Sequence, residues 1–267
     1  MTEKYFEEMA ICYRSNSFVS GRETLVFVHG LSGSLSAWRL YEKRFENSYN
    51  VLTYDIRGHG KSSKPREYAA YSIPHFARDL AALLTYLNIR ECILISHSFG
   101  TLIAFEFLHT YPGKVTKAVF LSPSVRPEAN TMSRLVRPLI VIGTLLVRVF
   151  PFSNRIGRHL DYSEFPNTTD WNIPVTWANI RNTSLRVYLF CSLQSYDFDA
   201  SSYIQDISIP VLLMHGARDS IFPVESTIAA QTRFPNAKLI VLPDIDHILV
   251  LNRFPQVSES IDSFVRE

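Results

Sequence analysis

Residues 96–100, Ser-His-Ser-Phe-Gly, place a serine at the centre of a segment with small residues at both ends. An apolar run over 92–95 precedes the segment, and an apolar, helix-like stretch over 101–108 follows it. A tight turn between a strand and a helix tolerates only small flanking side chains, and its strain pushes the central hydroxyl out above the end of the strand. The pattern predicts that Ser98 is a nucleophile, provided that the chain also supplies a base, an acid and an oxyanion hole.

His247 is the histidine best placed to act as the base, and Asp219 is the acid that we expect beside it. His247 ends a loop-like stretch over 243–247, directly after the last strand-like run of the chain. From there its ring would reach over the carboxyl edge of a sheet toward Ser98. Asp219 follows the preceding strand-like run, and a carboxylate there would fix the tautomer of the imidazole and stabilise its protonated form. The chain order of the predicted triad is therefore serine, aspartate, histidine.

Two backbone amides are predicted to form the oxyanion hole. One belongs to Phe99, the residue after the nucleophile, and the other to Leu31, in the loop after an earlier strand-like run. Gly30 lets that loop turn so that the Leu31 N–H can point at a developing oxyanion, and each such donor stabilises the transition state by about 3 kcal/mol. We place Gly30 and Ser32 beside the substrate, and we expect His29 to hold the loop by hydrogen bonds.

Six short apolar runs have the pattern of strands buried on both faces of a parallel sheet. They cover residues 25–28, 51–54, 92–95, 115–121, 211–214 and 238–242. Helix-like segments alternate with most of them: one has Ser72 as its N-cap, one begins at the Ser98 turn and stops at Pro112, and one closes the chain. This alternation predicts an α/β fold, with a mostly parallel central sheet flanked by helices.

Residues 124–207 interrupt this alternation. The segment has no strand-like run, and it contains the most lipophilic stretch of the chain, over 135–152. We interpret it as a helical cap domain over the carboxyl edge of the sheet, where ligands bind in open α/β sheets, with 1–123 and 208–267 as the core domain. Its apolar residues would occupy nearly every side of one helix, which favours a helix packed inside the cap. The alternative is that Leu146 and its neighbours line an acyl pocket.

Four blocks of the sequence resemble those of capped α/β-hydrolases. They are His-Gly-Leu-Ser-Gly-Ser at 29–34, Asp-Ile-Arg-Gly-His-Gly-Lys-Ser at 55–62, the serine segment at 96–100, and His-Gly-Ala-Arg-Asp at 215–219 followed by Asp246 and His247. The resemblance covers nearly the whole chain and implies the α/β-hydrolase fold, with a helical cap inserted after the sixth strand, and an esterase-like serine chemistry. The sequence departs from the family pattern at Ser96, where glycine is usual, and at Asp244 and Asp246, which are often glycines. Asp246 could raise the pKa of His247 or compete with Asp219 for it.

Composition and charge fit an ordered globular protein. The chain has 267 residues, of which 46% are hydrophobic, and its net charge of +2 gives no reason to expect a nucleic-acid partner. Three widely spaced cysteines match neither a disulfide framework nor a zinc site, and no histidine pair or carboxylate cluster has metal-ligand spacing. We therefore expect neither a metal nor a cofactor. An acidic N-terminus and an interrupted apolar stretch predict no signal peptide and no membrane span, hence a cytoplasmic protein.

The resemblance and the predicted triad favour hydrolysis of a carboxylic ester with a small to medium apolar acyl group, through an acyl-enzyme on Ser98. A serine at the turn counts against the related enzymes that use a carboxylate there. Two alternatives stay open: a carbon–carbon bond hydrolase or lyase that uses the same residues, and a ligand receptor of this fold that turns over slowly. The partner is in each case a small molecule, and the oligomeric state does not follow from the sequence.

Overall fold

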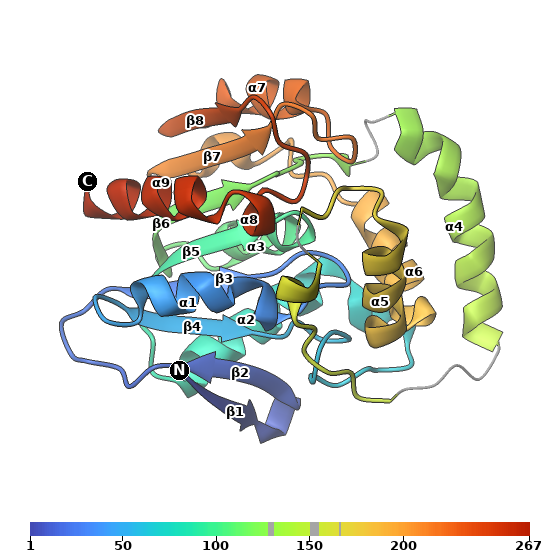
Figure 1. Ribbon diagram of the computed structural model, residues 1–267, viewed down its shortest axis with the longest axis horizontal. Helices are drawn as coiled ribbons and strands as arrows, with labels where there is room; N and C mark the ends of the chain where they lie inside the picture. Colours follow the sequence, from blue (N-terminus) through green and yellow to red (C-terminus); the bar gives the residue numbers. More distant parts are fainter. Residues whose placement is uncertain (128–130, 150–154, 166) are drawn as a thin grey trace.

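The computed structural model describes residues 1–127, 131–149, 155–165 and 167–267 (for 131–133 the backbone alone), which are built around an eight-stranded sheet (Figure 1). Its strands are β1 (Thr2–Phe6), β2 (Ile11–Ser15), β3 (Thr24–Val28), β4 (Asn50–Tyr54), β5 (Cys92–His97), β6 (Val115–Leu121), β7 (Val211–Gly216) and β8 (Ala237–Leu242). Their spatial order is β1-β2-β4-β3-β5-β6-β7-β8. The pairs β1–β2 and β2–β4 are antiparallel, and the other neighbouring pairs are parallel.

The six apolar runs that predict strands form the parallel part of this sheet, from β3 to β8. Every residue of β3, β4 and β7 is buried, because helices cover both faces of the sheet. The sequence pattern does not reveal β1 and β2. β1 lies at the sheet edge with its first four residues exposed, so an edge strand like this one does not require an apolar run. β2 is mostly buried, but its five residues include Arg14 and Ser15, which interrupt the apolar pattern.

Helices cover the two faces of the sheet as separate layers (Figure 1). The described α-helices are α1 (Arg39–Phe45), α2 (Ile73–Tyr86), α3 (Phe99–Thr110), α4 (Thr131–Val149), α5 (Ile173–Thr183), α6 (Leu185–Tyr196), α7 (Val224–Gln231), α8 (Leu249–Asn252) and α9 (Phe254–Arg266). The neighbours Val26 and Phe27 belong to different hydrophobic clusters, since successive side chains of a strand point to opposite faces. The cluster of Val26 includes residues of α2 and α3, and the cluster of Phe27 includes residues of α1 and α9.

Two predicted helix boundaries have a physical explanation in the structure. Ser72 is the N-cap residue of α2, but its hydroxyl lies 2.6 Å from His75 Nδ1 and does not bind a backbone amide of the helix. Pro74 is in the first turn of that helix, where its missing N–H costs no hydrogen bond. The helix α3 ends at Thr110, two residues before Pro112.

The segment between β6 and β7 forms α4, α5 and α6, and no strand occurs in its described residues. The three helices lie beyond the carboxyl ends of the parallel strands, to the right of the sheet in Figure 1. α6 joins the insertion to the core, because Phe190 packs edge-on against the rings of Tyr68 and Tyr71. The segment therefore covers the edge of the sheet at which the Ser98 turn lies.

α4 contradicts the expectation that the apolar stretch 135–152 packs inside the insertion. Among its described side chains, Thr144 and Val147 are buried, and both belong to the face that meets α6, where Gly143 also lies close to Leu189. Six large apolar side chains are instead more than half exposed: Leu135, Leu139, Ile142, Leu145, Leu146 and Val149. Residues 150–152 of the stretch lie outside the described part. Among the described residues, no helix is long and apolar enough to span a bilayer.

Candidate active site

Ser98 occupies the turn between β5 and α3 in a strained backbone conformation. Its φ of 52° and ψ of −119° are rare for a residue with a side chain. Position 100 requires glycine, because a Cβ there would come within 2.6 Å of the carbonyl oxygen of Val28. Ser96 is fully buried, and its hydroxyl has no hydrogen-bond partner among the described residues. A serine thus fits at the position where the family usually has glycine, at the cost of an unsatisfied polar atom.

Two short hydrogen bonds link Ser98, His247 and Asp219. Ser98 Oγ is 2.6 Å from His247 Nε2, and His247 Nδ1 is 2.7 Å from Asp219 Oδ2. The loops after β5, β7 and β8 supply the three residues, and each residue is 8% exposed. When Nδ1 donates its proton to the carboxylate, Nε2 is left as an acceptor for the Ser98 hydroxyl. This arrangement can draw a proton from the serine.

Asp219 has three hydrogen-bonding neighbours besides His247. Its Oδ1 accepts the backbone N–H groups of Ile221 at 2.9 Å and Phe222 at 2.8 Å, and its Oδ2 lies 3.0 Å from His215 Nε2. Burial alone would raise the pKa of Asp219, but the charge of His247 and the hydrogen bonds outweigh it and hold the pKa well below its usual range. Asp219 is therefore a carboxylate at any working pH. The sequence pattern did not assign this role to His215, although its place four residues before the acid is a usable signal.

Two further carboxylates hold the His247 loop. Asp170, from the inserted segment, accepts the backbone N–H of His247 at 2.9 Å, and Asp246 accepts those of Asp170 at 3.2 Å and Ile248 at 3.1 Å. Burial would lower the pKa of His247, but the charge and hydrogen bond of Asp219, together with the charges of Asp170 and Asp246, raise it. Asp246 thus affects His247 through its charge, while the ring itself is bonded to Asp219. No feature of the sequence pattern pointed to Asp170.

Phe99 and Leu31, the two predicted oxyanion donors, belong to the two segments that meet at Ser98. Phe99 is the first residue of α3, so its N–H has no carbonyl one turn earlier in the helix. A Cβ on Gly30 would be 3.2 Å from Ser98 Cβ, which shows how closely the loop that carries Leu31 approaches the serine. Ser32, with a φ of 56°, lets the chain turn back directly afterwards. Amide donors in these places are suited to bind an oxyanion formed at Ser98.

Two buried histidines fix the backbone around Ser98. His29 lies 2.8 Å from the carbonyl oxygen of Gly30 through Nδ1 and accepts the N–H of Ile56 through Nε2. His97 Nε2 lies 2.9 Å from the carbonyl oxygen of His247, to which it donates. Burial lowers the pKa of both, to about 3 for His97, so both rings are neutral. The contacts of His29 are those of a residue that holds its loop.

A cavity of about 220 Å³ lies over Ser98 and His247. The core contributes Gly30, Leu31 and Ser32 to its wall, and the inserted segment contributes Tyr162, Asp170, Thr176, Asn179 and Tyr188 among others. Leu146, the candidate for the wall of an acyl pocket, is absent from the described wall and is 54% exposed. That prediction is wrong, because α4 meets α6 through its opposite face.

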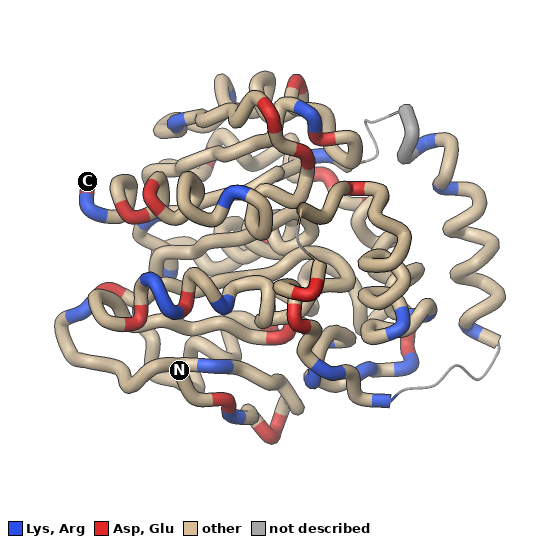
Figure 2. Tube along the Cα trace, in the orientation of Figure 1, with Lys and Arg blue, Asp and Glu red and all other residues tan. Residues whose placement is uncertain are grey.

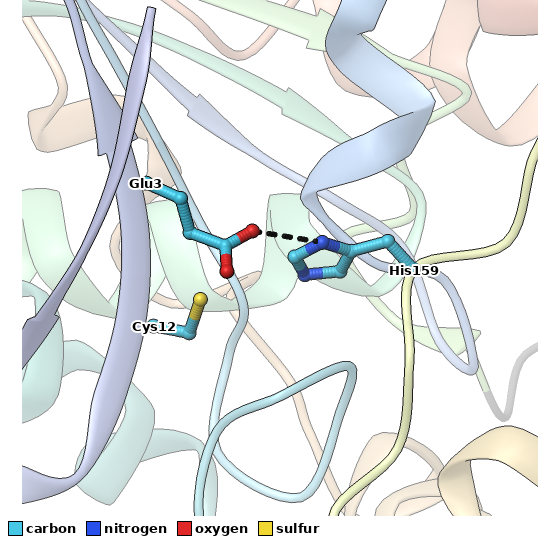
Figure 3. A group of neighbouring side chains, drawn as sticks. All are labelled: Glu3, Cys12 and His159. Atoms are coloured by element: carbon cyan, nitrogen blue, oxygen red, sulfur yellow. Dashed lines mark ion pairs between the residues drawn. The ribbon is translucent and has the colours of Figure 1, made fainter.

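Glu3, Cys12 and His159 form a second group of chemically active side chains, drawn in Figure 3. Their ligand-type atoms lie within 4.8 Å of one another, as a metal site would need. Glu3 already pairs with His159 Nδ1 at 3.3 Å and with Lys61 Nζ at 2.6 Å, and His159 Nε2 lies 2.7 Å from Asp55. Burial, with the nearby carboxylates of Asp55 and Glu3, raises the pKa of the Cys12 thiol to about 12, so it stays protonated. The group ties the inserted segment to β1 and to the loop after β4.

Residues 23–254 match a family model described as alpha/beta hydrolase fold. A Synechocystis protein named "Putative non-heme chloroperoxidase" is 27% identical over 256 residues, which cover 91% of each chain. The Mus musculus protein ABHD8 is 26% identical over 247 residues. These cover 91% of this chain but 54% of ABHD8, so the chain spans about half the length of that relative.

Solved structures share the architecture at low sequence identity. MGS-M2, an alpha/beta hydrolase enzyme from a Medee basin deep-sea metagenome library, has a TM-score of 0.77 and 20% identity, and the match covers 100% of this chain and 98% of that one. A thermophilic esterase from Thermogutta terrifontis has a TM-score of 0.74 and 22% identity, over 96% of this chain and 93% of that one. At such identities the likeness establishes the fold.

Proposed function

We propose that this chain, which belongs to the alpha/beta hydrolase fold family, is a serine hydrolase that cleaves carboxylic esters with a small to medium apolar acyl group. The observation that carries the proposal is the pair of short hydrogen bonds from Ser98 through His247 to Asp219, beneath a cavity. An imidazole whose far nitrogen is bonded to a buried carboxylate is suited to take a proton from serine and to hold it.

In the acylation step, His247 Nε2 takes the proton of Ser98 as Oγ attacks the carbonyl carbon of the ester. The carbonyl oxygen becomes an oxyanion, which the amides of Leu31 and Phe99 stabilise. Each of these donors would lower the barrier by about 3 kcal/mol. When the tetrahedral intermediate collapses, His247 gives the proton to the oxygen of the leaving alcohol, and the acyl group remains on Ser98.

In the deacylation step, His247 takes a proton from a water molecule that attacks the acyl carbon. The second tetrahedral intermediate uses the same two amides, and its collapse returns the proton to Ser98 Oγ and releases the carboxylic acid. Asp219 keeps its negative charge throughout and stabilises the imidazolium that forms in each step. The two steps together consume one ester and one water molecule and release the alcohol and the carboxylic acid, with no other reactant.

We assign residues 124–207 as the cap of this site, and residues 1–123 and 208–267 as the core. In support, both parts contribute residues to the wall of the cavity, and Asp170 of the insertion binds the backbone of His247. The volume of about 220 Å³ is smaller than that of most drug-sized ligand sites, which favours short acyl groups. The esterase from Thermogutta terrifontis is a neighbour of the same fold with ester-cleaving activity in its description.

Hydrolysis of p-nitrophenyl esters, from acetate to laurate, tests the proposal with three proteins: the wild type, Ser98→Ala and the matched control Ser96→Ala. We expect turnover of the short esters by the wild type and by Ser96→Ala, since the Ser96 hydroxyl has no hydrogen-bond partner in the described part of the chain. Ser98→Ala should lose about 10⁴-fold or more in kcat. Equal activity of Ser98→Ala and the wild type would refute the assignment of the nucleophile.

No turnover of any ester by a folded wild-type protein would refute the esterase proposal and leave the family assignment intact. A screen of enolisable diketones would then test for a carbon–carbon bond hydrolase on the same residues. Tight ligand binding with a single turnover would instead indicate a receptor.

A further inference from the structure

Three side chains with metal-ligating atoms meet beside the edge of the sheet, away from Ser98. Figure 3 shows Glu3 on β1, Cys12 on β2 and His159 of the inserted segment converging on one point. An oxygen, a sulfur and a nitrogen atom of the three lie within 4.8 Å of one another. Residues so far apart in the chain have no ligand spacing in the sequence, but the fold brings together the donors that a metal ion requires.

The group is shielded from solvent on two sides and open on the third. Cys12 is fully buried, and the side chain of His159 is 7% exposed. The side chain of Glu3 is 34% exposed, which leaves a path by which an ion can enter. Figure 2 shows positive and negative segments interleaved along β1 and β2. This edge of the sheet is therefore not a broad acidic surface that attracts cations in general.

Other polar groups already orient two of the three side chains. His159 Nε2 lies 2.7 Å from Oδ2 of the buried Asp55, whose carboxylate also accepts the N–H groups of Leu35 and Lys61, both at 2.8 Å. When Nε2 donates its proton to Asp55, the neutral ring keeps its lone pair on Nδ1, as in histidines that bind a metal and are held by a carboxylate. Lys61 Nζ lies 2.6 Å from Glu3 Oε1, so Oε2 is the oxygen that faces His159.

The separation of the two facing atoms fits a shared ion. Glu3 Oε2 and His159 Nδ1 are 3.3 Å apart. A direct charge-assisted hydrogen bond is shorter, about 2.7–2.9 Å. Two ligand atoms that each lie about 2 Å from a tetrahedral zinc ion are about 3.3 Å apart. The carboxylate of Glu3 and a thiolate of Cys12 would together neutralise the two positive charges of such an ion.

We propose that Glu3, Cys12 and His159 bind one Zn²⁺ ion through Oε2, Sγ and Nδ1, with water as the fourth ligand. A thiolate and an imidazole select zinc over magnesium or calcium, which prefer oxygen ligands alone. On binding, the S–H bond of Cys12 breaks, its sulfur bonds to the ion, and the proton passes to solvent. The ion would join the inserted segment to the first two strands more firmly than the present ion pair does.

Titration of the whole chain with Zn²⁺, after treatment with a chelator, tests the site. By calorimetry we expect one ion per chain, with a dissociation constant of about 1 μM or lower. Zinc should also raise the melting temperature, because the folded state alone brings the three ligands together. Titration with Co²⁺ should give the absorption band of a cobalt–thiolate bond. No substrate is present, so the result is independent of the proposed esterase activity.

Two matched pairs of variants identify the ligands. Glu3→Gln and Glu7→Gln each remove one exposed negative charge near the start of the chain, but Glu7 is not in the group. We expect Glu3→Gln to weaken zinc binding by about tenfold or more and Glu7→Gln to leave it nearly unchanged. Cys12→Ala and Cys92→Ala each remove a buried thiol from a strand. The cobalt–thiolate band should disappear in Cys12→Ala and persist in Cys92→Ala.

Three results would overturn the proposal. The first is a folded wild-type chain that binds no Zn²⁺ at about 0.1 mM. The second is equal zinc affinity in Glu3→Gln and Glu7→Gln, and the third is a cobalt complex of the wild type without the thiolate band. Circular dichroism shows whether each variant is folded. Should Cys12→Ala fail to fold, the band of the wild type and the half-exposed Glu3 still decide the question.

Discussion

The surroundings of Ser98 and the outer face of α4 differ in how firmly the protein fixes a side chain. His247 is bound through both ring nitrogens, its backbone amide and its carbonyl oxygen, and Asp219 accepts from two amides as well as from His247. On α4, by contrast, Leu139 is 68% exposed and Val149 is 81% exposed. A change near Ser98 should therefore alter the reaction, whereas a change on the outer face of α4 should leave the reaction unchanged.

The largest effect is expected from Asp219→Asn. The amide cannot carry the charge that stabilises imidazolium, and it favours the wrong tautomer of His247, so kcat should fall by about 10⁴-fold. The matched control is Asp246→Asn, next to the histidine, where the carboxylate binds backbone amides and an amide oxygen can still accept. We expect the control to change kcat by less than about threefold. Steady-state kinetics on a short ester would measure both, and equal losses would mean that Asp219 is not the acid.

The pH dependence of kcat/KM should report how the charge of a nearby carboxylate changes the pKa of His247. The free base is the reactive form, so kcat/KM should fall by about tenfold per pH unit below the pKa of His247. Because the surrounding carboxylates raise that pKa, the fall should begin above 6.5, the value of an unperturbed histidine. Asp170→Asn removes one negative charge while keeping an oxygen to accept the His247 N–H. The pKa should then drop, and the acid limb should move to lower pH.

The outcome for Asp170→Asn separates electrostatic from purely structural support. If Asp170 only held the loop, the substitution would leave the acid limb in place and lower the plateau instead. A limb that moves to higher pH would contradict the sign of the charge effect. The comparison variant is Asp246→Asn, because the charge of Asp246 also raises the pKa of His247. Ser98→Ala cannot be used for this comparison, since it would lack the measurable kcat/KM that a pH profile requires.

The sequence patterns placed Ser98, Asp219 and His247 together because each lies in the loop after an apolar strand, and hydrogen bonds join the three in the structure. Parallel strands place their carboxyl ends at one edge, so Ser98, Asp219 and His247 had to meet once the strands were recognised. The close approach at Gly100 is likewise a local requirement of the turn. The family assignment and the mostly parallel sheet followed from the same local signals, and the comparisons confirm both.

The features that the sequence did not predict depend on how separate elements dock. The contact of Asp170 with His247 exists because the inserted segment folds back over the sheet, and no local pattern records that. Leu146 failed as a pocket residue for a similar reason. A helix that is apolar nearly all round does not reveal which face will pack, and here the face with Val147 meets α6. The edge strand β1 was missed because an exposed strand carries few apolar residues.

The smallest effect is expected from Leu139→Gln on α4. Its side chain is 68% exposed, so the free energy of unfolding should change by less than about 0.5 kcal/mol, and ester turnover should stay the same. Val147→Ala on the buried face of the same helix is the matched control, and we expect it to lower the free energy of unfolding by about 1.5 kcal/mol. Urea denaturation would measure both. A loss of about 2 kcal/mol in Leu139→Gln would mean that the outer face of α4 is packed against another surface in solution.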